Sequence, residues 1–169
     1  MSSGFSAVAG VGPRTGTSFV MCSAVAAGIP VHGERFPSCV VPDHNPDGYW
    51  ELDPHDRGPW CGRVVKLWGR VISEVSPSRL VLLERQDKDQ QLKSMEKVRE
   101  AELAMAPDFY AGISKDCYAG ISASTMLDTY VVNIPEWTRN ISPRHILRVY
   151  THELSNRIGE ILAFLQRGI

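Results

Sequence analysis

The chain has 169 residues, of which 43% are hydrophobic and 22% are charged. A chain of this length fits one hydrophobic core, so we expect a single domain over residues 1–169, and its composition excludes a largely disordered protein. Eighteen Lys and Arg residues stand against nineteen Asp and Glu, a formal charge of −1. Because no general positive field exists, any contact with nucleic acid must come from a local basic patch.

The sequence contains no apolar run near the ~20 residues that a membrane span needs. Residues 1–6 lack the basic segment and following apolar block of a secretory signal. We therefore expect a cytoplasmic protein without membrane contact. No feature of the sequence indicates an obligate protein partner.

The first expected elements are a strand, a tight loop and a helix. Residues 5–10 (FSAVAG) form a short run of apolar and small residues, the segment VGPRTGTS follows, and residues 19–29 are again apolar. Gly28 and Pro30 should end that helix, because glycine suits a helix C-terminus and proline cannot continue it.

Prolines dominate the next segment, residues 30–60. Pro30, Pro37, Pro42, Pro46, Pro54 and Pro59 alternate there with Asn, Asp, Gly and His. This composition predicts a long irregular segment, and such segments within compact domains usually serve as lids or substrate-binding loops.

Strand and helix patterns alternate through the rest of the chain. Short apolar strands are expected at residues 63–72, 79–84 and 145–150, and helices at residues 90–105, 122–134 and 153–166. Unbroken apolar strands indicate burial on both faces, hence a parallel sheet between helices. We predict a doubly wound α/β fold with its ligand site at the carboxyl ends of the strands.

The loop between the first strand and helix is the most specific motif. Glycines let a backbone turn tightly with its N–H groups directed inward, and the helix adds the positive end of its dipole. The segment therefore predicts a phosphate site formed by Gly10, Gly12, Pro13, Arg14, Thr15, Gly16, Thr17 and Ser18. The alternative is a glycine-rich turn that binds nothing.

The loop departs from the Walker pattern G-x-x-x-x-G-K-[ST] in two ways. Aligned on Gly16, the pattern places Ser18 at the Mg²⁺-binding hydroxyl but finds Thr17 in place of lysine. The pattern also expects its first glycine at position 11, where the chain has Val11 with Gly10 and Gly12 on either side. Arg14 can replace the missing positive charge, because guanidinium groups bind phosphate oxygens in pairs.

Three segments resemble the P-loop sulfotransferase and nucleotide-kinase superfamily: PRTGTS at residues 13–18, NPDGYWE at residues 45–51, and the HILRVYTHEL…IGEILAFL ending. The chain's size and the first two segments also resemble the bacteriophage 5-hydroxymethyluracil DNA kinases of thymine hypermodification. The resemblance implies a P-loop kinase with ATP or another nucleoside triphosphate as donor, Mg²⁺ as cofactor, and DNA containing a modified pyrimidine as acceptor.

Sulfuryl transfer is the main alternative. Sulfotransferases with such a loop hold the 3′-phosphate of their donor with an arginine after the third strand and a later serine. Arg85 and Ser94 take these places, but Ser94 lies one residue further along the chain than in those enzymes. A sulfotransferase would need no Mg²⁺. A nucleotide-sensing module without catalysis is the non-enzymatic alternative.

Phosphoryl transfer requires Mg²⁺, positive charge and a carboxylate near the attacking hydroxyl. Glu84, at the end of the apolar segment RLVLLE, can hold a metal-bound water or can instead be a surface residue paired with Arg85. Asp47 and Glu51 flank Tyr49 and Trp50, which either stack on a base or pack the loop. One of the two acids would then face the acceptor hydroxyl.

Arginines supply the candidates for neutralising charge in the transition state. Arg14 is the first candidate because it lies within the loop itself. The others precede the late strand or lie in it: Arg139, Arg144 and Arg148.

Overall fold

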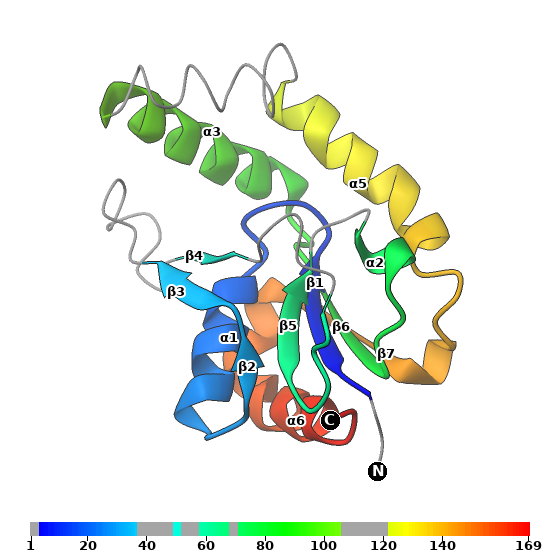
Figure 1. Ribbon diagram of the computed structural model, residues 1–169. Helices are drawn as coiled ribbons and strands as arrows, with labels where there is room; N and C mark the ends of the chain where they lie inside the picture. Colours follow the sequence, from blue (N-terminus) through cyan, green and yellow to red (C-terminus); the bar gives the residue numbers. More distant parts are fainter. Residues whose placement is uncertain (1–3, 37–48, 52–57, 68–70, 106–121) are drawn as a thin grey trace.

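The computed structural model describes residues 4–36, 49–51, 58–67, 71–105 and 122–169. Its centre is a five-stranded sheet in the order β2-β5-β1-β6-β7, in which all pairs are parallel (Figure 1). The strands are β1 (Ser6–Gly10), β2 (Val31–His32), β5 (Val64–Leu67), β6 (Arg79–Glu84) and β7 (Ile146–Tyr150). The predicted α/β class with a parallel sheet between helices is confirmed.

The central strands β5 and β6 are apolar along their buried length, apart from Lys66 in β5, because both of their faces are covered. All four residues of β5 are buried, as are the four central residues of β6. The expected strand at residues 63–72 is too long, since β5 ends at Leu67 and the short helix α2 (Val71–Glu74) begins four residues later. His145 likewise lies outside β7, in the 3₁₀ helix η1 (Pro143–His145).

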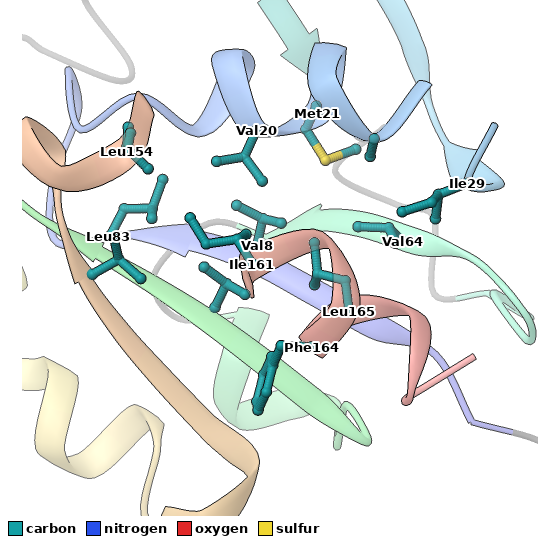
Figure 2. Close-up of a cluster of buried hydrophobic side chains, with 13 residues drawn as sticks. Val8, Val20, Met21, Ile29, Val64, Leu83, Leu154, Ile161, Phe164 and Leu165 are labelled. Atoms are coloured by element: carbon teal, nitrogen blue, oxygen red, sulfur yellow. The ribbon is translucent and has the colours of Figure 1, made fainter. Parts of the chain in front are cut away.

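Two helices cover one face of the sheet (Figure 1). These are α1 (Thr17–Ala26) and α6 (Leu154–Gln166), which contact each other as well as β1. Figure 2 shows their apolar side chains meeting those of the sheet in one buried cluster, which includes Val8, Val20, Met21, Val64, Leu83, Ile161 and Leu165. The buried apolar residues of α6 therefore face this core.

The opposite face is covered by α2 and by α5 (Ala123–Trp137). Alternate strand residues point to this side, and the second buried cluster includes Ala7, Ala9, Val65, Leu80, Leu82, Ile72 and Ile134. Because successive side chains of a strand face opposite ways, the two clusters together account for burial on both faces. The sheet is thus doubly wound.

The helix α5 begins as the sequence predicts. Ser122 is its N-cap, and the Ser122 hydroxyl accepts a hydrogen bond from the amide of Thr125 at 3.1 Å. The helix α3 (Lys88–Met105) starts two residues before its predicted position. In Figure 1, α3 and the beginning of α5 lie beyond the carboxyl ends of the strands, whereas the end of α5 reaches α2.

The Pro-rich segment is more regular than predicted where the structure describes it. β2 adds an edge strand to the main sheet by pairing with β5. Two further strands, β3 (Glu34–Phe36) and β4 (Tyr49–Glu51), form a separate antiparallel pair in which Phe36 lies opposite Tyr49. The expectation of an irregular segment is wrong for these residues, whereas residues 37–48 and 52–57 lie outside the described part.

Among the described residues, we find no helix with the length and apolar character needed to cross a bilayer.

Candidate functional site

The sheet topology itself selects one position for a ligand. From β1 the chain crosses to β2 on one side, whereas from β6 it continues to β7 on the other side. β1 and β6 are neighbours, so the strand order reverses between them, and α/β folds bind ligands in the crevice at such a point. The loop after Gly10 and the residues after Glu84 lie at this crevice.

Left-handed residues alternate along the loop. Gly12, Arg14 and Gly16 have φ values of 83°, 64° and 89°. Alternation of this kind turns backbone N–H groups toward a common concave side, the geometry of anion-binding nests. Because Arg14 has a Cβ atom, its left-handed backbone costs ~1–2 kcal/mol.

The glycines also permit close packing. A Cβ atom added to Gly12 would lie 2.9 Å from Leu127 Cδ1, and one added to Gly16 would lie 2.5 Å from Leu154 Cδ1. One added to Gly10 would overlap the Thr15 hydroxyl. The loop is therefore fitted against α5 and α6, and larger residues at these positions would displace it.

Thr15 serves the inside of the turn. Its side chain is buried, and its hydroxyl donates to the carbonyl oxygen of Gly12 at 3.3 Å. Val11 fixes the start of the loop, since its amide donates to the carbonyl oxygen of Leu83 at 2.8 Å. Both contacts restrain the backbone of the loop. Because the Thr15 hydroxyl donates within the turn, Thr15 would contact a ligand through its main chain.

Thr151 joins the loop to the sheet and was missed by sequence reasoning. Its hydroxyl lies 3.0 Å from the carbonyl oxygen of Thr15 and 3.1 Å from that of Glu84. It belongs to the 3₁₀ helix η2 (Thr151–Glu153), directly after β7. A threonine directly after the predicted strand at residues 145–150 is the signal that could have indicated it.

The turn that carries Thr151 is held by Glu153. The Glu153 carboxylate accepts hydrogen bonds from the amide of Tyr150 at 3.1 Å and from the guanidinium of Arg157 at 3.0 Å. The hydrogen bond from the Tyr150 amide lowers the pKa of Glu153 most, and the hydrogen bond from Arg157 lowers it further. The carboxylate thus stays ionised and keeps the turn in place.

The start of α1 directly follows the loop. Gly16 is its N-cap and offers no side-chain hydrogen bond to the first turn. Thr17 and Ser18 occupy that turn, and both are partly exposed. The first amides of a helix have no partners within it, so this end of α1 presents N–H groups and positive dipole charge.

The side chain of Arg14 connects the loop to α3. Its Nε donates to the hydroxyl of Ser94 at 3.1 Å. Arg85 donates to the carbonyl oxygen of Arg14 at 3.5 Å and also to the side chain of Gln90. The structure therefore brings Arg14, Arg85 and Ser94 together, although Ser94 is one residue out of the expected spacing.

Gln91 is a second contact that sequence reasoning missed. Its side-chain nitrogen donates to the carbonyl oxygens of Val11 at 3.1 Å and Pro13 at 2.7 Å. A single glutamine within a polar helical segment carries no pattern that predicts such a role.

Glu84 ends β6 beside the loop, but its partner differs from the expected one. Its carboxylate forms an ion pair with Arg148 of β7 rather than with Arg85. The sheet register explains this pairing. Arg148 lies opposite Leu82, two residues before Glu84, so Arg148 and Glu84 are diagonal neighbours on adjacent strands. The pair is open to solvent, with Arg148 55% exposed, and exposed pairs are worth only about 0–1 kcal/mol.

The remaining predicted residues are not brought to the loop by any described contact. The carbonyl of Arg144 accepts from Arg79, which begins β6, so Arg144 lies at the amino end of the strands, where it cannot serve the crevice. Arg139 is exposed after α5. Asp47 lies outside the described residues. Glu51 belongs to β4, which contacts α1 and places Glu51 opposite Glu34.

The chain matches no protein-family model, no curated protein and no solved structure.

Proposed function

We propose that the protein is a kinase that transfers the γ-phosphoryl group of ATP, or of another nucleoside triphosphate, to a hydroxyl group. The supporting observation is the loop of residues 10–16. Its left-handed residues alternate, it leads into a helix start without a side-chain cap, and it lies where the strand order reverses. These features favour a polyphosphate ligand held by main-chain amides.

The residues present suit Mg²⁺, because the Ser18 hydroxyl is a hard oxygen ligand of the kind that this ion prefers and the Glu84 carboxylate would hold a water bound to it. When bound, Mg²⁺ neutralises charge on the β- and γ-phosphates. Glu84 must then leave Arg148, and the exposure of that pair keeps the cost of separation small.

In the reaction, the acceptor oxygen attacks the γ-phosphorus while the bond to the bridging oxygen breaks and ADP leaves. Arg14 neutralises the charge that develops on the transferred group and so replaces the missing lysine. The proton of the acceptor hydroxyl passes to a carboxylate, for which Asp47 and Glu51 are the candidates. We assign these roles to the loop and to the segment that follows α1.

The proposed acceptor is the hydroxymethyl group of 5-hydroxymethyluracil in bacteriophage DNA. The resemblance of GPRTGTS and NPDGYWE to kinases of this class supports it. Arg14 and Arg85, which are in contact beside the loop, supply the local positive charge that DNA binding requires of a protein with no net positive charge. A cytoplasmic location, that of the host for a viral protein, follows from this acceptor.

One observation favours sulfuryl transfer as the second candidate. Arg85 and Ser94 both contact Arg14, which forms a second cationic group beside the loop. Such a group suits the 3′-phosphate of a 3′-phosphoadenosine donor. This reaction would proceed without Mg²⁺.

Labelled donors distinguish the candidates. The protein should transfer ³²P from [γ-³²P]ATP to DNA that contains 5-hydroxymethyluracil but not to matched thymine DNA, and EDTA should stop the transfer. Transfer of ³⁵S from the 3′-phosphoadenosine donor in EDTA would instead establish the sulfotransferase. Tight ATP binding without label on either DNA would contradict the kinase with this acceptor and support a nucleotide sensor.

A further inference from the structure

The contact between α3 and the loop is made by the side-chain amide of Gln91. Gln91 is fully buried, and both bonds to the loop start from its Nε2 atom. A primary amide nitrogen carries two N–H donors, so a single atom satisfies the carbonyls of Val11 and Pro13. A carboxylate or an apolar side chain of the same length would satisfy neither.

The geometry of the peptide bond turns this contact into control of two amides. The peptide bonds of the described loop are trans. In a trans peptide the carbonyl oxygen and the following N–H point in opposite directions. Since Gln91 holds the carbonyls of residues 11 and 13 toward α3, the N–H groups of Gly12 and Arg14 must point away from α3.

The other end of the Gln91 amide shows what this arrangement costs. Its Oε1 atom is buried and lacks a hydrogen-bond partner in the structure of the described residues. Turning the amide over would place its oxygen against two carbonyls and lose both bonds. A buried polar atom without a partner needs an explanation, and here the explanation is that both donors are committed to the loop.

We propose that Gln91 is a positioning residue of the phosphate loop. It directs the N–H groups of Gly12 and Arg14 to the side on which the phosphates bind, so it acts through the loop and not on the ligand. This role rests on the proposed function, because it presupposes that the loop binds nucleotide.

Two substitutions of graded severity test the role. Gln91→Met keeps the length of the side chain but has no donor, whereas Gln91→Asn keeps both donors on a chain that is shorter by one carbon. Titration of ATP by calorimetry should give the affinity order wild type, Gln91→Asn, Gln91→Met. The Gln91→Met variant should bind at least about tenfold more weakly, which corresponds to ~1.4 kcal/mol.

A control separates positioning from simple stability. Ser6→Ala removes another buried hydrogen bond, from the Ser6 hydroxyl to the Leu165 carbonyl at 2.6 Å, at the opposite end of β1. It should lower the midpoint of urea unfolding without changing the affinity for ATP. If Gln91 had a purely structural role, Gln91→Met would likewise lower the midpoint of urea unfolding without changing the affinity for ATP.

Nuclear magnetic resonance supplies a second readout that applies even if Gln91→Met does not fold. Addition of ATP should shift the amide signals of Gly12 and Arg14 in the wild-type protein, and these shifts should shrink in Gln91→Asn. Wild-type affinity and shifts in Gln91→Asn, or wild-type affinity in a folded Gln91→Met, would overturn the role of Gln91 alone. No ATP binding by the wild-type protein would overturn the proposed function as well.

Discussion

Replacing Gly16 with alanine is expected to weaken ATP binding by at least about a hundredfold, or ~2.7 kcal/mol. Gly16 has a φ of 89°, and an added Cβ would lie 2.5 Å from Leu154 Cδ1. The left-handed backbone alone costs ~1–2 kcal/mol for an alanine. Relief of the contact with Leu154 must also move the start of α1, where the phosphates are proposed to bind.

Gly28→Ala is the matched control for this substitution. Gly28 also has a positive φ, 72°, but its added Cβ would meet nothing within 4 Å, and it lies beyond the far end of α1. It should lose stability and keep its affinity for ATP. Calorimetric titration of both variants, below their melting temperatures, makes the comparison. A folded Gly16→Ala protein with wild-type affinity would show that the loop does not hold the nucleotide.

Arg14→Ala should separate catalysis from binding. Because main-chain amides carry the proposed binding, the Kd for ATP should rise by less than about tenfold. The rate constant for transfer should fall by roughly 10³, the lower part of the range for an arginine that stabilises a phosphoryl-transfer transition state. Single-turnover transfer from [γ-³²P]ATP and calorimetric titration measure the two quantities.

Ser94→Ala serves as the control for Arg14. It removes the hydrogen bond to Arg14 Nε while it leaves the guanidinium in place. Transfer should therefore slow far less than in Arg14→Ala. Equal losses of binding and rate in Arg14→Ala would assign Arg14 an anchoring role and contradict its proposed part in the reaction.

Much of the fold could be predicted from local sequence because the relevant patterns are local. The mostly apolar residues of β1, β5 and β6 reflect burial on both faces, and this burial is typical of the parallel sheet that the structure contains. The loop of residues 10–16 was recognisable because tight turns require glycine. Its place between β1 and β6 then follows from the strand order.

The short strands could not be predicted because their sequences are too brief to show a period. β2 has two residues and β3 and β4 have three each, and they form through pairing with other strands. The interior of a proline-rich segment gives no local sign of such partners. Tertiary pairing, and not local propensity, determines these elements.

The missing site contacts share another cause, which is distance along the chain. Glu84 pairs with Arg148, 64 residues away, instead of with the adjacent arginine. Gln91 contacts the loop across about 80 positions, and Thr151 reaches Thr15 across 136. The left-handed φ of Arg14 could not be predicted from the sequence either, since arginine has no preference for this conformation. Only the assembled sheet brings these groups together.

A crystal structure of the protein soaked with a non-hydrolysable ATP analogue and Mg²⁺ tests the central claim most directly. We expect phosphate oxygens at roughly 2.7–3.2 Å from loop amide nitrogens between Gly12 and Ser18. A loop filled by the protein's own side chains, with the analogue absent or bound elsewhere, would contradict the claim that these main-chain amides hold the donor.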